Sequence, residues 1–161
     1  MTNPISSRLP IALSLLLGGL LFAAEPAHAQ VVSTSSFTLA VSGTASAVKT
    51  GLAETVQFSG PLIVTATVVN DPTLGPAVAL FVDGRGVTGT GNKTKTAYAN
   101  TCVANLTRPF GPTDVVRTTF AFFQNVPGGY MSAKTGLLTL NLTYNTTTQA
   151  LTNVTACVGT M

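Results

Sequence analysis

The chain has 161 residues, of which 45% are hydrophobic and only 8% are charged, and its formal net charge is +3. This length is within the range of a single domain built around one core. The small number of ionisable side chains limits the chemistry that such a domain can perform.

The first 29 residues predict a cleaved signal peptide. A single basic side chain, Arg8, is followed by the apolar run Leu9–Ala24 and by Ala27-His28-Ala29, which is the pattern that a signal peptidase recognises. The alternative is a membrane anchor, but the uninterrupted apolar core is shorter than the ~20 residues that span a bilayer. We therefore expect residues 30–161 to be exported to the periplasm, the cell surface or the medium, in a bacterium.

Two cysteines remain in the exported part, Cys102 and Cys157. In an oxidising compartment such a pair favours a disulfide. The bridge would close a loop of about 56 residues and stabilise the fold by roughly 4 kcal/mol. A metal or redox role is the alternative, and it lacks a Cys-x-x-Cys motif and any histidine beyond the signal.

The hydrophobic pattern of the exported part has a period of two. In Leu138–Tyr144, apolar side chains alternate with Thr and Asn, which is typical of a half-buried strand. The abundance of threonine also favours strands over helices. We predict one all-β domain, an antiparallel β-sandwich of about eight to ten strands, with a β-barrel as the alternative. The predicted strands are Phe37–Val41, Thr55–Phe58, Leu62–Val68, Val78–Val82 (apolar on both faces), Ala97–Ala104, Val115–Phe123, Leu138–Tyr144 and Val154–Val158, and turns are expected at Ser59-Gly60-Pro61, Asn70-Asp71-Pro72 and Asp83-Gly84.

Two short motifs resemble catalytic or cofactor-binding elements. Gly84–Gly89 has the glycine spacing of a dinucleotide-binding loop, but the polar, Gly-broken sequence after it favours a hairpin loop over the required helix. Ser46 and Lys49 have Ser-x-x-Lys spacing, and Lys134-Thr135-Gly136 matches a second element of penicillin-recognising enzymes. In that family the Ser-x-x-Lys turn opens a helix in a much larger mixed domain, and this chain has no Ser-Asp-Asn element, so we interpret the match as coincidental.

The acidic residues of the exported part are Glu54, Asp71, Asp83 and Asp114. A pair of them would be needed for glycoside hydrolysis, but Asp71 and Asp83 lie at predicted turns. Asp83 or Asp114 with backbone carbonyls could hold a weak calcium ion. We expect no enzymatic activity and no cofactor or metal site.

The basic residues Arg85, Lys93 and Lys95, near Tyr98, are interpreted as a solvated loop, because three charges neutralise few phosphates. We therefore expect no nucleic-acid partner. Asn-x-Thr sequences are glycosylation sites in a eukaryotic secretory pathway and a Thr-rich strand surface in a bacterium, which we favour. The asparagines concerned are Asn92, Asn105, Asn141, Asn145 and Asn153.

The remaining features indicate a surface rather than a pocket. From Thr135 to Met161 there is no Lys, Arg, Asp or Glu, and uncharged strand edges can pair with strands of another chain. We predict a structural or adhesive protein of the cell envelope, whose partners are further copies of itself or other envelope proteins. Gln30–Ser36 is the candidate donor strand. The architecture resembles exported pilin-like and adhesin-like sandwiches of bacteria, although their usual disulfide lies earlier in the domain than Cys157.

The alternative function is a binding module for a small apolar ligand. Its site would lie among five phenylalanines, which plain core packing would also explain. These residues are Phe58, Phe81, Phe120, Phe122 and Phe123.

Overall fold

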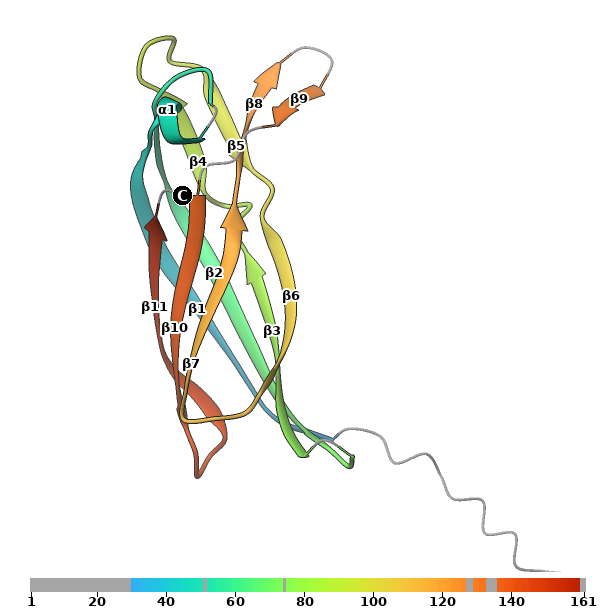
Figure 1. The fold of residues 1–161 in the computed structure, drawn as a ribbon. Helices are drawn as coiled ribbons and strands as arrows, with labels where there is room; N and C mark the ends of the chain where they lie inside the picture. The colour runs from blue at the N-terminus through green and yellow to red at the C-terminus, as the bar shows by residue number, and fades with distance from the viewer. Residues whose placement is uncertain (1–29, 51, 74, 127–128, 133–135, 160–161) are drawn as a thin grey trace, which may run out of the picture.

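The computed structural model describes residues 30–50, 52–73, 75–126, 129–132 and 136–159; the predicted signal peptide lies outside them. The described chain is an elongated antiparallel β structure with one helical turn (Figure 1), which confirms the predicted all-β antiparallel class, although its described residues form eleven strands and not eight to ten. Its elements are β1 (Gln30–Ala45), α1 (Ala47–Thr50), β2 (Val56–Asp71), β3 (Gly75–Asp83), β4 (Thr88–Gly91), β5 (Ala97–Asn100), β6 (Val103–Pro109), β7 (Thr113–Phe120), β8 (Phe122–Val126), β9 (Gly129–Ser132), β10 (Gly136–Asn145) and β11 (Ala150–Gly159).

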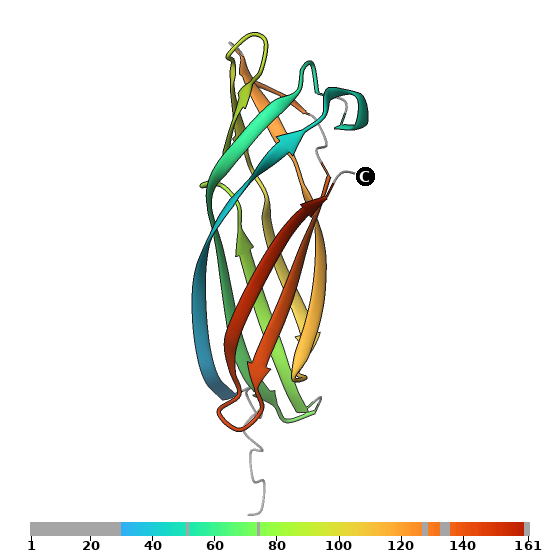
Figure 2. The same cartoon turned by 90° about the vertical axis from the view of Figure 1, so that its left-hand side faces the viewer.

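The described strands form two sheets rather than a closed barrel. The larger sheet has eight strands, in the order β6-β3-β2-β4-β5-β8-β9, with β1 paired to β2. The smaller sheet has the order β11-β10-β7 and covers one end of the larger one (Figures 1 and 2). The two sheets meet along two seams: β1 lies beside β11, and side chains link the β6 region to β7.

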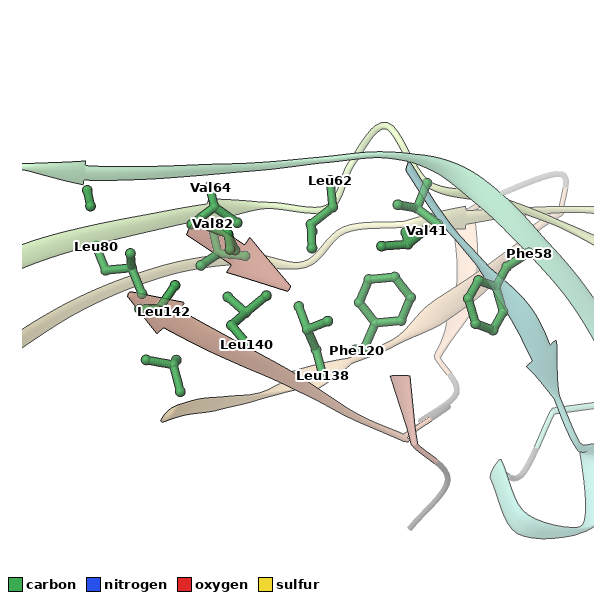
Figure 3. Packing of buried hydrophobic residues seen from close by; sticks show 14 of the residues in the cluster. Val41, Phe58, Leu62, Val64, Leu80, Val82, Phe120, Leu138, Leu140 and Leu142 are labelled. Carbon is green, nitrogen blue, oxygen red and sulfur yellow. The ribbon is translucent and has the colours of Figure 1, made fainter. Parts of the chain in front are cut away.

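The core lies between β10 and the strands of the larger sheet (Figure 3). Alternation in β10 buries Leu138, Leu140 and Leu142 almost completely, as the sequence pattern predicts. The facing side of β2 presents Leu62, Val64, Ala66 and Val68, each at most 1% exposed. Burial of each leucine or valine stabilises the fold by about 1.5 to 3 kcal/mol relative to exposure, so these two strands make a large apolar contribution.

The expectation that Val78–Val82 is buried on both faces is wrong. Val78, Leu80 and Val82 face the core, whereas Ala79 is exposed and Phe81 is only partly buried. The reason is that β3 lies between β2 and β6 in a sheet whose outer face is not covered by a further layer of the described residues. The outward-facing apolar side chains of β3 cost little stability, because Ala79 is small and Phe81 is partly buried.

The predicted strand Val115–Phe123 is two strands in different sheets. β7 ends at Phe120 in the smaller sheet, and β8 begins at Phe122 in the larger one. Both rings are fully buried, their centroids lie 5.3 Å apart and their planes are perpendicular. The chain therefore changes sheet at Ala121, and an alternating apolar pattern alone cannot reveal such a crossing. Similarly, the predicted strand Ala97–Ala104 divides into β5 and β6.

The turn predicted at Ser59-Gly60-Pro61 is also wrong, because β2 continues through it. This is the point where β2 changes partners, pairing with β4 up to Ser59 and with β3 from Ile63. Gly60 has φ of +145°, and a side chain there would lie 2.8 Å from the Cα atom of Val87. Glycine thus permits a kink and a close approach within a strand instead of ending it.

Candidate functional site

The two predicted cysteine partners do not form a disulfide. Cys102 lies between β5 and β6, and its thiol donates to the carbonyl oxygen of Thr119 in β7 at 3.1 Å. Cys157 is exposed on β11, with β10 between it and β7. Since β11 turns Ala156 and Val158 inward, Cys157 faces outward, away from the seam that holds Cys102. The positions of the two cysteines in the sequence do not reveal that a strand lies between them in the sheet.

Glu54 has a structural role that its position in the sequence did not reveal. The residue is 5% exposed, and its carboxylate accepts hydrogen bonds from the backbone N–H groups of Lys93 (2.7 Å) and Thr94 (3.0 Å). It also accepts one from the Thr94 hydroxyl, which is the main cause of the lowered pKa of Glu54. The carboxylate therefore holds the turn between β4 and β5 against the segment that leads into β2.

The other acidic residues are also engaged in structural contacts. Asp83 binds Arg85 through its side chain, with Nη2 to Oδ2 at 2.6 Å, and Asp114 binds Arg108 through two hydrogen bonds of 2.8 and 2.9 Å. In each pair the hydrogen bonds from the arginine are the largest cause of the lowered pKa of the carboxyl. Asp71 accepts from the N–H of Thr73 at 2.8 Å, as expected for a turn.

A calcium ion at Asp83 or Asp114 would have to displace these arginine contacts. Within the described ranges, no three His, Cys, Asp or Glu side chains gather in a way that could hold a metal ion. Glu54 lies in the segment before β2, Asp71 at the end of β2, Asp83 at the end of β3 and Asp114 in β7.

The glycine-rich segment forms a turn over residues 84–87 and enters strand β4 at Thr88, which agrees with the predicted hairpin and loop. The N–H of Val87 donates to the carbonyl oxygen of Gly84 at 2.9 Å, and strand β4 follows directly. No helix N-terminus is present there to receive a pyrophosphate. Ser46, in contrast, does precede a helical turn: its carbonyl oxygen accepts from the N–H of Thr50 at 3.0 Å. Lys134 and Thr135 of the second motif lie outside the described residues.

The basic residues near Tyr98 do not form the patch considered from the sequence. Arg85 is held by Asp83, and Lys95 donates from Nζ to the carbonyl oxygen of Asn92 at 3.1 Å. Tyr98 is 3% exposed and faces the core, and its burial is the main cause of its raised pKa. The arrangement is that of a solvated turn whose aromatic neighbour points inward. All five asparagines of the Asn-x-Thr sequences are exposed.

The phenylalanines proposed for a ligand site are largely core residues. The ring of Phe58 lies 5.9 Å from that of Phe120 and 5.3 Å from that of Phe122, measured between centroids. The three exposed fractions are 5%, 0% and 0%. These three rings pack against one another in the core, as expected if the phenylalanines serve core packing and not ligand binding.

The seam between β6 and β7 is closed by polar contacts. The bidentate pair of Arg108 and Asp114 joins β6 to β7, and Cys102 binds Thr119 near the other end of β7. The ring of Phe110 packs edge-on against that of Tyr144, with centroids 5.6 Å apart. Side chains thus bind the two sheets together at this seam.

The opposite seam, between β1 and β11, is held at one end and open at the other. The two strands run side by side in the same direction (Figure 2), and the Ser33 hydroxyl donates to the carbonyl oxygen of Gln149. Further along lies a cleft of about 280 Å³. It is lined by Leu39, Ala40, Val41, Ser42, Ala156 and Val158.

Both strands at this cleft have a backbone edge without a hydrogen-bonded partner strand in the described chain. Among the described residues, β1 is paired only with β2, and β11 only with β10. Neither strand contains Lys, Arg, Asp or Glu, and β10 contains none either. The lack of charge in the C-terminal strands is visible in the sequence. The proximity of Leu39 and Val158 could not be predicted, because the two residues lie on strands at opposite ends of the exported part.

The predicted donor segment Gln30–Ser36 is not a free arm in the structure. It is the first part of β1 and pairs with residues 65–70 of β2. The expectation that it precedes the first strand is therefore wrong. The predicted strand began only at the apolar residues from Phe37 onward. In the structure its pairing with β2 extends back to Gln30, and hydroxyl contacts of Thr34 with Thr67 (3.3 Å) and Ser36 with Thr65 (3.0 Å) lie along this extension.

Comparison with protein-family models, curated proteins and solved structures finds no match to this chain. In the part of the chain that the structure describes, no helix has the length and hydrophobicity of a membrane span. Any function must therefore be argued from the surface and the contacts above.

Proposed function

We propose that the chain is an exported, non-enzymatic structural or adhesive component of the cell envelope, which associates with further copies or other envelope proteins through its uncharged strand edges. The export part of the proposal rests on the signal pattern of residues 1–29. The assembly part rests on the seam between β1 and β11.

The observation that carries the proposal is the combination of strand edges without a hydrogen-bonded partner strand and the lack of charge on both strands at one seam. Soluble β proteins usually protect an exposed edge with lysine, proline, a bulge or a covering loop, because unpaired N–H and C=O groups attract other strands. The open end of this seam has no charged residue on either bordering strand. An edge without such protection is suited to pairing.

The contrast with the other seam strengthens this argument. At the β6–β7 seam, an arginine and an aspartate are held in a bidentate contact, and a charge on each side discourages the approach of a neutral strand. The same small fold therefore protects one seam and leaves the other unprotected. The four acidic side chains of the exported part take part in ion pairs and in hydrogen bonds to turns, which supports a structural role.

The experiment is a comparison of self-association in two lysine variants of the full exported chain. Val158→Lys places a charge in the cleft, and Val115→Lys, on the exposed outer face of β7, is the matched control. Sedimentation velocity over a range of concentrations should show association of the wild type and of the control, but only monomers of Val158→Lys. Circular dichroism verifies that both variants are folded. If the wild type stays monomeric and binds no envelope protein, the proposal fails.

A further inference from the structure

All lysines of the described residues lie at one end of the elongated molecule, which we call the basic end. They are Lys49 in α1 and Lys93 and Lys95 in the turn between β4 and β5, and all three are exposed. Figure 1 shows α1 and this turn together at the upper end. The set differs from the basic residues grouped from the sequence, because Arg85 is bound to Asp83 and the fold adds Lys49.

Thr55 holds α1 and the β4–β5 turn together at the basic end. Its hydroxyl accepts a hydrogen bond from the N–H of Ala47 at 3.5 Å, and its carbonyl oxygen accepts one from the N–H of Asn92 at 2.9 Å. Lys49 and Lys93 follow these two donors closely along the chain. Residues far apart in the sequence therefore present their ammonium groups on one small surface.

The positive charge of the basic end is not paired with acidic side chains. Neither of the two salt bridges in the described ranges involves a lysine. The acidic residue of this end, Glu54, is buried and accepts from the N–H groups of Lys93 and Thr94. The Nζ atom of Lys95 donates to the neutral carbonyl oxygen of Asn92 at 3.1 Å. Three exposed ammonium groups thus lie in front of one buried carboxylate.

Lys95 occupies a backbone conformation that is unfavourable for lysine. Its φ is +60°, in the left-handed region that glycine and asparagine adopt more readily. Residues in such conformations are concentrated at functional sites. A lysine at this turn therefore favours a role for its side chain beyond closing the turn.

An apolar side chain protrudes beside these charges. Val48 is 95% exposed, more than any other large hydrophobic residue of the described chain, and it directly precedes Lys49. Basic side chains bind the phosphates of an anionic membrane, and an adjacent apolar side chain enters the boundary between headgroups and acyl chains. An acidic polysaccharide would use the lysines but would leave the valine in water.

We propose that the basic end binds the surface of an anionic phospholipid membrane, with the ammonium groups on lipid phosphates and Val48 inserted among the headgroups. This inference goes beyond the self-association proposed above and needs only the export of the chain to the cell envelope. Because the lysines lie at one end of the elongated fold, the bound molecule would stand away from the membrane (Figure 1).

Co-sedimentation of the full exported chain with vesicles tests the proposal. Vesicles of equimolar phosphatidylglycerol and phosphatidylcholine should bind the chain roughly a hundredfold more tightly than phosphatidylcholine alone, at about fivefold for each lysine. Lys93→Gln should therefore weaken binding about fivefold. Arg117→Gln is the matched control, because it removes an exposed charge on β7 and should leave binding unchanged. Equal losses in the two variants, or no binding to the anionic vesicles, would overturn the proposal.

Two further variants test the apolar contact and exclude a folding defect. Val48→Ser should weaken vesicle binding about tenfold and leave binding to soluble dextran sulfate unchanged; an unchanged affinity for vesicles would overturn the membrane in favour of an anionic polymer. Lys95→Asn should weaken vesicle binding without lowering the urea midpoint, because asparagine tolerates the left-handed conformation. Sedimentation velocity without vesicles measures self-association separately, so failure of one proposal is distinguishable from failure of the other.

Discussion

Arg108 and Asp114 join the two sheets at one seam through two hydrogen bonds, whereas no charged residue is present on either strand at the other seam. This asymmetry connects the fold with the proposed function. The closed seam fixes the relative position of the sheets, and the strands of the open seam carry no charge that would oppose pairing with another chain.

The substitution Asp114→Asn should lower the free energy of unfolding by about 1 kcal/mol at neutral pH, a modest effect because the side chain of Arg108 is 41% exposed. The pKa of Asp114 is lowered in the folded state, so its contribution is present above its ordinary value of 3.8 and is lost as the pH falls below it. Urea unfolding at several pH values measures both effects. Asp83→Asn is the control and should change stability less, because Asp83 ends β3 and its ion pair is local, with Arg85 two residues further along the chain.

The substitution Leu140→Ala should cost about 2 to 5 kcal/mol, since this side chain is fully buried between the sheets and its removal leaves a cavity. Ile63→Ala, on the outer face and 39% exposed, should cost less than about 1 kcal/mol. Equal losses in the urea midpoints of the two variants would contradict the assignment of β10 as the centre of the core.

Replacement of Glu54 by glutamine should loosen the turn between β4 and β5. The backbone N–H groups of Lys93 and Thr94 lose their charged acceptor, so their hydrogen exchange should become faster in the variant. The wild type should lose the same protection as the pH falls below about 4.5, because the pKa of Glu54 is lowered by these contacts and its stabilisation exists only above the ordinary value. Unchanged exchange at both amides would show that the carboxylate does not hold the turn.

Alkaline pH should destabilise the protein through Tyr144. Burial, together with the nearby Asp114, raises the pKa of this phenol from 10.0 to about 12. Ionisation therefore favours the unfolded chain, and stability should fall from pH 10 to about 12. Urea midpoints across this range measure the loss, and Tyr144→Phe should reduce its slope; an identical slope would contradict the prediction.

The sequence predicted the antiparallel class and the faces of the regular strands, because the alternation in Leu138–Tyr144 directly reflects burial on one side. It failed where the chain departs from regular geometry. The crossing at Ala121 is hidden by apolar residues on both sides of it, and the kink at Gly60 uses the same residue types as a turn.

The candidate site was predictable only in part. The lack of charge in the last strands is visible in the sequence and indicated an edge that could pair. The cleft depends on β1 lying beside β11, and the sequence pattern does not reveal which strands are neighbours. The expected disulfide of Cys102 and Cys157 is wrong because β10 lies between β11 and the strand that Cys102 contacts. Local patterns cannot report such long-range neighbours.

Native mass spectrometry of the exported full chain tests the central claim most directly, because one spectrum reports both the assembly state and any bound molecule. The account predicts oligomers whose masses are whole multiples of the chain without added mass, increasing with concentration. A monomer at every concentration would contradict self-association through the strand edges. A monomer that carries a discrete additional mass would instead favour a carrier of an apolar ligand.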